Sequence, residues 1–176
     1  MGHYLIIGGS GGIGSALARA LKAEGHTLHL TGRDVSRLQA IATETGATFT
    51  VGDVLDQGFI ASAVLEAGPV LDGLAYCAGT INLKPLARLR EADFHRDHAV
   101  HALGAVQTIQ VALPALRAAS GTASILLFSS IAVAQGFALH ASISMAKGAI
   151  EGLTRALSAE LAPKIRVNAI APSLTD

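Results

Sequence analysis

The sequence predicts a three-layer α/β domain in which helices cover both faces of a doubly wound parallel sheet. Strand-sized apolar segments alternate with amphipathic helical patterns along all 176 residues, without an internal repeat or a low-complexity linker. The first apolar segment also ends in a glycine-rich turn that leads directly into a helical pattern. Such alternation requires a parallel sheet, because right-handed crossovers place the connecting helices on its two faces. We therefore expect residues 1–176 to form a single domain.

The glycine-rich turn indicates a site for a nucleotide diphosphate. The apolar run Tyr4–Ile7 stops at Gly8–Gly14, whose sequence is GGSGGIG. Glycines leave room for phosphates and permit positive φ angles. The helix that follows, predicted from Ile13, Leu17 and Leu21, directs unpaired N–H groups and the positive end of its dipole at the anion. A glycine-rich string alone could be no more than a tight turn, but its place between a strand and a helix favours phosphate binding.

The remaining elements follow from apolar patterns and from helix start and stop signals. Further strands are expected at residues 27–31, 48–51, 73–77, 123–128 and 165–169. Helices are expected from an Asp34 cap to Gly46, and over residues 56–67, 91–119 and 142–161, with Pro163 closing the last. Pro114 is expected to kink the helix 91–119. The prediction is a Rossmann fold with strand order 3-2-1-4-5-6, whose ligands lie at the carboxyl ends of the strands.

Composition excludes several other classes of protein. Thirteen basic residues balance thirteen acidic ones, so nothing favours binding to nucleic acid or to a membrane surface. Cys77 is the only cysteine, which excludes an internal disulfide and a cysteine-rich metal site. His95, His98 and His101 are spaced three apart and would splay around a helix, so no metal site is expected. No N-terminal signal region is visible, and a cytoplasmic location is expected.

Several motifs, in order, resemble the short-chain dehydrogenase/reductase family. Its glycine motif is matched by Gly8, Gly12 and Gly14, with Ile7 in place of a threonine. The other matches are Asp53-Val54 after the third strand, Ala78-Gly79 after the fourth (preceded here by Tyr76-Cys77), and the segment Gly148–Pro172 with its Arg166–Ala169 core. The resemblance implies NADP or NAD as cofactor and assigns its binding to Gly8, Ser10, Gly11, Gly12, Ile13, Gly14, Arg33, Asp53, Val54, Ala78, Gly79, Lys147 and Pro172.

The end of the second strand favours NADP over NAD, although NAD stays possible. Members of the family that prefer NAD carry an acid there, and this position falls on Gly32. Arg33 follows, and a guanidinium can pair with a 2′-phosphate. The alternative is that Arg33 is a solvated surface charge and that Asp34 serves only as a helix cap.

The resemblance also implies a catalytic set, and this chain departs from it. Lys147 and Ser130 match the family's lysine and serine, His101 stands at the asparagine position, and Ile143 stands where the proton-donating tyrosine belongs. Isoleucine cannot donate a proton. His101 and His140 are candidate replacements, because histidine titrates near neutral pH. Ser142 and Ser144 flank the empty position but point to either side of it, and each histidine could equally be a packed or exposed residue.

Two hypotheses about function remain open at this stage. The first is an NADP-dependent oxidoreductase that transfers hydride to or from a small carbonyl or alcohol substrate, with an atypical proton donor. The second is a catalytically inactive dinucleotide-binding regulatory or sensor subunit.

The resemblance carries two further expectations. A homodimer or homotetramer is expected through the helices 91–119 and 142–161, as in the family. The family usually continues beyond the position of Asp176, so we expect that a substrate-binding part and a seventh strand are not covered by this sequence.

Overall fold

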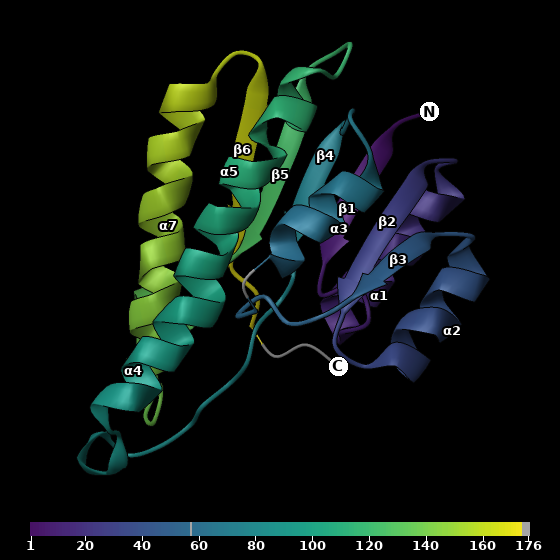
Figure 1. The fold of residues 1–176 in the computed structure, drawn as a ribbon. Helices are drawn as coiled ribbons and strands as arrows, with labels where there is room; N and C mark the ends of the chain where they lie inside the picture. Colours follow the sequence, from purple (N-terminus) through teal and green to yellow (C-terminus); the bar gives the residue numbers. More distant parts are fainter. Residues whose placement is uncertain (57, 174–176) are drawn as a thin grey trace.

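The computed structural model describes residues 1–56 and 58–173 and confirms the predicted fold class. All strand pairs are parallel, and the sheet has the predicted order, β3-β2-β1-β4-β5-β6 (Figure 1). The strands are β1 (His3–Ile7), β2 (Thr27–Gly32), β3 (Thr48–Val51), β4 (Gly73–Tyr76), β5 (Ala123–Phe128) and β6 (Ile165–Ile170). The helices are α1 (Gly12–Ala23), α2 (Val35–Thr45), α3 (Phe59–Ala67), η1 (Leu86–Arg88), α4 (Glu91–His98), η2 (Ala99–Leu103), α5 (Gly104–Arg117), α6 (Ala132–Gln135) and α7 (Ala141–Leu161).

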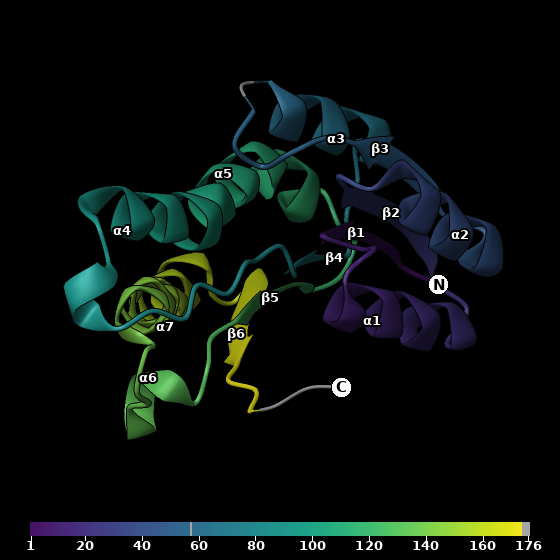
Figure 2. The same cartoon turned by 90° about the horizontal axis from the view of Figure 1, so that it is seen from below.

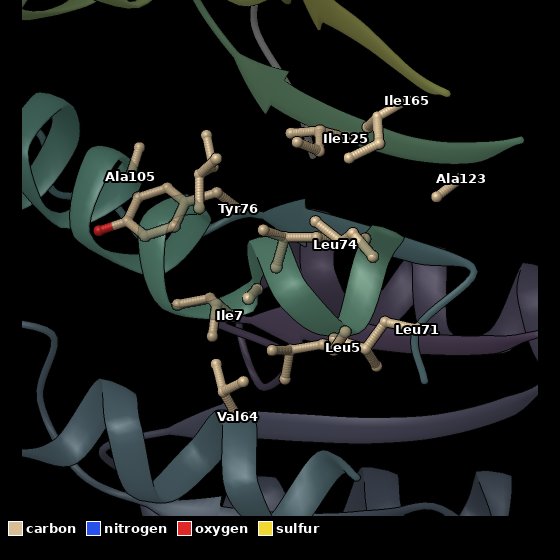
Figure 3. Close-up of a cluster of buried hydrophobic side chains, with 14 of the residues drawn as sticks. Leu5, Ile7, Val64, Leu71, Leu74, Tyr76, Ala105, Ala123, Ile125 and Ile165 are labelled. Atoms are coloured by element: carbon tan, nitrogen blue, oxygen red, sulfur yellow. The ribbon is translucent and has the colours of Figure 1, made fainter. Parts of the chain in front are cut away.

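Two hydrophobic clusters hold the layers together, one on each face of the sheet. The larger cluster joins α3, α5 and α7 to β1, β4, β5 and β6, and Figure 3 shows part of it around Leu5, Leu74 and Ile125. The smaller cluster joins α1 and α2 to β1 and β2. Figure 2 separates α3 and α5 from α1 on opposite sides of the sheet. The last three residues of β1 and all of β4 are buried, as expected for central strands covered on both faces.

The order in which strands are added to the sheet changes direction at β4, and this change determines where on the sheet ligands bind. From β1 the chain proceeds through β2 and β3 to one side of the sheet, then returns to β4, which pairs with the other side of β1. The connections that leave the carboxyl ends of β1 and β4 therefore run to opposite faces of the sheet, and ligands of such sheets bind at this switch point.

Local signals explain where the helices begin and end. The Asp34 carboxylate caps α2 as predicted, by accepting a hydrogen bond from the amide of Arg37. Gly46 ends α2 in the left-handed conformation, at φ 67°. The predicted helix 56–67 starts too early, because α3 begins at Phe59 after Gly58 at φ 85°. Residue 57, within that prediction, and residues 174–176 of the predicted domain lie outside the described residues.

A long helical segment forms over Glu91–Arg117, close to the predicted range 91–119, but it is not a regular α-helix throughout. A five-residue π-helical turn, η2, separates α4 from α5, and the helix continues through Pro114 to Arg117. The segment Glu91–Arg117 is long and apolar enough to cross a membrane by length and composition, but 56% of its most apolar window is buried, as in a core helix. The short helices η1 and α6 were not predicted.

Candidate functional site

The turn after β1 brings three backbone segments into contact. Gly8 has φ 81°, and a Cβ there would lie 2.7 Å from the amide nitrogen of Ala78. A Cβ at Gly14 would overlap the carbonyl oxygen of Gly8. The amide of Cys77 donates to the carbonyl of Ile7 and ties the end of β4 to the end of β1. These glycines are therefore required by the close approach of β1, β4 and the first turn of α1.

The N-terminus of α1 is open to a ligand. Gly11 is the N-cap residue, and no side chain caps the helix there. The first amides of a helix, here those of Gly12, Ile13 and Gly14, have no acceptor within the helix. Together with the positive end of the helix dipole they favour an anion at this end of α1. The backbone thus fits the pyrophosphate that the sequence predicts.

A cleft of about 700 Å³ lies beside this turn, at the carboxyl edge of the sheet. Eight predicted cofactor residues line it: Gly8, Ser10, Gly11, Arg33, Asp53, Val54, Ala78 and Gly79. The other five, Gly12, Ile13, Gly14, Lys147 and Pro172, are not among its lining residues. The carbonyl of Pro172 accepts from the amide of Ile131, which holds the segment after β6 against the segment after β5.

The rim of the cleft above β2 is positively charged. Arg33 is 62% exposed, and its Nη1 lies 3.3 Å from Oδ2 of Asp53 across the ends of β2 and β3. A Cβ at Gly32 would lie 2.5 Å from the hydroxyl oxygen of Ser10, so a side chain at that position would require this hydroxyl to rotate. Arg37 and Arg96 also line the cleft. Sequence reasoning missed both; Arg37 shares a helix face with the Asp34 cap, which was a usable signal, whereas Arg96 comes from α4 and no local pattern marks it.

Lys147 and Ser130 lie at the carboxyl end of β5. The ammonium of Lys147 donates to the carbonyl of Phe128, the last residue of β5, at 2.6 Å. Burial lowers the pKa of Lys147 to about 8, an effect that Cys77 partly opposes. The hydroxyl oxygen of Ser130 accepts from the amide of Ala132 at 3.2 Å, which fixes the turn into α6.

The position expected for a proton-donating tyrosine is closed. Ile143 is 5% exposed on the first turn of α7. The hydroxyl of Ser142 donates to Oδ2 of the buried Asp97 at 2.6 Å, and that of Ser144 donates to the carbonyl of Ala132 at 3.2 Å. The hydroxyls of both serines that flank Ile143 therefore have acceptors within the protein.

The two tyrosines of the chain, Tyr4 and Tyr76, do not compensate. Tyr4 lies near the start of β1, at the other end of the sheet from the cleft. Tyr76 is buried, its hydroxyl donates to the carbonyl of Val100, and burial raises its pKa. Ile143 therefore has no phenolic substitute at this site.

His101 lies deep in the η2 turn, against the segment after β4. It is 2% exposed, and its Nε2 lies 3.0 Å from the carbonyl oxygen and 3.3 Å from the amide nitrogen of Thr80. Its Nδ1 has no hydrogen-bond partner among the described residues. Burial, together with the smaller effect of the Lys147 charge, lowers the pKa of His101 to about 4. The ring is therefore uncharged at neutral pH. Its Nε2 donates to the carbonyl of Thr80 in one tautomer and accepts from the amide of Thr80 in the other.

The other candidates lie further from this chemistry. His140 is the N-cap residue of α7, and its Nδ1 lies 2.7 Å from the carbonyl oxygen of Ala138 in the preceding loop. His95 pairs with Glu91 on the exposed side of α4, at 3.2 Å. Cys77 lines the cleft, but burial raises the pKa of its thiol to about 12, so it is protonated at neutral pH.

Comparison with known proteins identifies the class. A sequence model of the family described as enoyl-(acyl carrier protein) reductase matches residues 8–176. The chain is 32% identical to L-2,3-butanediol dehydrogenase of Corynebacterium glutamicum, over 97% of this chain and 70% of that protein. It is 35% identical to a 3-dehydrosphinganine reductase of Arabidopsis thaliana, over 99% of this chain but only 56% of that protein.

A solved structure agrees with these sequence relatives. The fold matches a short-chain dehydrogenase/reductase (glucose/ribitol dehydrogenase) of Brucella melitensis with a TM-score of 0.90 and 33% identity, over 98% of this chain and 75% of that one. The chain belongs to the short-chain dehydrogenase/reductase family, whose members are oxidoreductases that use NAD or NADP.

The burial of Lys147 predicts a dependence of stability on pH. The folded protein releases the Lys147 proton near pH 8, whereas the unfolded chain holds it up to about pH 10.4. Between these values the unfolded state binds more protons, so the free energy of unfolding of the wild type rises with pH relative to that of Lys147→Met. Urea unfolding of both proteins from pH 7 to pH 10 measures the difference. A difference that stays constant across this range would contradict the shifted pKa.

Proposed function

We propose that this chain binds NADP(H) and catalyses hydride transfer between the dinucleotide and a small carbonyl or alcohol substrate. The observation that carries the proposal is the open N-terminus of α1, held by the Gly8 and Gly14 backbone contacts beside a cleft at the switch point. The glycines allow the backbone contacts that bring the first turn of α1, with its unpaired amides, to the side of the cleft. When bound, the nicotinamide ring supplies or accepts the hydride.

Residues of the cleft rim would set the choice of cofactor. Gly32 stands at the position of the acid that would repel a 2′-phosphate, so this repulsion is absent here. Arg33 presents an exposed guanidinium beside that position, with Asp53 as its present partner. A 2′-phosphate carries more charge than the Asp53 carboxylate and offers bidentate acceptors to the guanidinium. Arg33 would hold this phosphate, and Asp53 would be free to accept from the adenine amine.

Residues at the carboxyl end of β5 would act on the substrate and the ribose. Lys147 is positioned by the Phe128 carbonyl to donate to ribose hydroxyl oxygens, and Ser130 to hold the substrate oxygen. Ile143 contributes an apolar wall and no proton. The Nδ1 of His101 is buried and its Nε2 contacts Thr80, so His101 would act on the cleft by holding this part of its wall.

One observation favours a second function. The buried Ile143 closes the position from which a tyrosine would donate its proton, and the hydroxyls of the two neighbouring serines have acceptors within the protein. A protein that retains the dinucleotide site and lacks the proton donor is suited to a regulatory or sensor role. The two functions share cofactor binding and differ in turnover.

Fluorescence titration with NADPH and NADH tests the cofactor. We expect the wild type to bind NADPH more tightly, and Arg33→Ala to lose roughly 10- to 100-fold of that preference, since a hydrogen bond to a charged group is worth about 1.5–3 kcal/mol. Arg19→Ala is the matched control, because Arg19 pairs with Glu44 between α1 and α2, away from the cleft. Equal affinity of the wild type for both cofactors, or an unchanged preference in Arg33→Ala, would refute the assignment of Arg33.

Introducing a tyrosine at position 143 tests the proposed catalysis. We expect Ile143→Tyr to raise carbonyl reduction roughly 10²- to 10⁴-fold, the usual contribution of a positioned proton donor. The measurement is the NADPH absorbance decay over a panel of small carbonyl compounds. Ile143→Phe is the matched control, since it adds the ring without the hydroxyl, and Lys147→Ala should abolish the gain. A wild type that is inactive on the whole panel, together with binding of NADPH, would favour the sensor. An activity that Ile143→Tyr removes would show that the native protein uses another route for the proton.

A further inference from the structure

The η2 turn frees one backbone carbonyl beside the core. The amide of Gly104 donates to the carbonyl of Ala99, five residues earlier. In a regular α-helix this amide would donate to the carbonyl of Val100, four residues earlier. The carbonyl of Val100 therefore loses its usual donor where α4 passes into α5.

Tyr76 supplies the replacement donor from the end of β4. Its side chain is 3% exposed, and its hydroxyl donates to the carbonyl of Val100 at 2.6 Å. A Cβ at Gly104 would overlap this hydroxyl, so the glycine makes the space that the phenol occupies. Figure 3 shows the Tyr76 ring beside Ala105, with its oxygen directed toward the helix. Tyr76 and Gly104 are thus complementary partners across the sheet–helix interface.

The π turn decides where His101 points. An extra residue within a helix rotates the preceding part by about 100° relative to the following part. His101 is the middle residue of η2. In this register its imidazole lies against Gly79, where an added Cβ would come 2.7 Å from Cε1, and its Nε2 reaches Thr80. Gly79 and Thr80 both line the cleft.

We propose that Tyr76 is a positioning residue for His101. Its hydroxyl holds the carbonyl that the π turn releases and so fixes the helix register in which the imidazole lies between the cleft wall and Lys147. This inference rests on the proposed function and deepens it, because it explains how His101 is held at the proposed site.

The hydroxyl, and not the volume of the ring, carries this role. A phenylalanine at position 76 would fill the same space between β4 and α5 and leave the hydrophobic cluster intact. It would leave the carbonyl of Val100 without the donor from Tyr76. A buried carbonyl that loses its donor favours rearrangement of the turn toward a regular helix, which turns His101 away from Thr80. The charge of Lys147 acts on His101 and that of Asp53 acts on Tyr76, so the ionisation of His101 reports its burial and its position relative to Lys147.

The experiment is a pH titration of the histidine imidazoles by two-bond ¹H–¹⁵N NMR, with His101 assigned from His101→Gln. In the wild type we expect His101 to stay uncharged at neutral pH and to titrate near pH 4. In Tyr76→Phe we expect its pKa to rise by about one unit or more toward its ordinary value of about 6.5, with mixing of its two tautomers. Tyr4→Phe, which removes the other phenol of the chain, should leave the His101 signals unchanged.

Unchanged His101 signals in Tyr76→Phe would overturn the proposal. Should Tyr76→Phe fail to fold, Gly104→Ala displaces the hydroxyl while keeping the ring, and its spectra are judged by the same criterion. NADPH titration of the same samples separates this inference from the proposed function. A wild type that binds no dinucleotide refutes the function and leaves the His101 readout valid, whereas unchanged His101 signals refute the inference and leave cofactor binding intact.

Discussion

The close approach of three backbone segments at the end of β1 is the constraint on which the rest of the site depends. Gly8 touches the backbone of Ala78 after β4, and Gly14 touches the carbonyl of Gly8. Any side chain at these positions would separate β1 from β4 or push α1 outward, at a cost of about 1–3 kcal/mol for such overpacking. Because the contact is kept, the uncapped first turn of α1 lies at the carboxyl edge of the sheet, beside the segment Gly79–Thr80 that lines the cleft.

Burial determines the chemistry at the other end of the site. The same exclusion of water lowers the pKa of Lys147 to about 8 and that of His101 to about 4. Lys147 therefore remains largely a cation at neutral pH, while His101 is uncharged, and the two lie close enough for the lysine charge to depress the histidine pKa. Ile143 adds an apolar, closed surface where an ionisable phenol would complete the set. The proposed site has groups that would bind and orient a cofactor and a substrate. It differs from the usual site of the family in how a proton would reach the substrate oxygen.

The fold could be predicted from the sequence because its signals are local and mutually consistent. Apolar runs such as Ala123–Phe128 marked the strand boundaries, and the glycines marked the tight turn after β1, since its backbone geometry requires that residue type. The η2 turn could not be predicted, because its register depends on Tyr76, which is distant in sequence and lies on a strand. Arg96 was missed for the same reason: only the packing of α4 brings it to the cleft. Tertiary contacts of this kind also set the pKa values of the site, so the sequence could name candidates such as Lys147 and His101 but not their protonation states.

The most direct test of the account is a ¹H–¹⁵N NMR titration of the protein with NADP, followed at the backbone amides of Gly12, Ile13 and Gly14. We expect the chemical shifts of these amides to change together and to saturate with the bound fraction, because the pyrophosphate would accept hydrogen bonds from the first turn of α1. Saturable NADP binding that leaves the three amides unperturbed, or no binding at all, would contradict it.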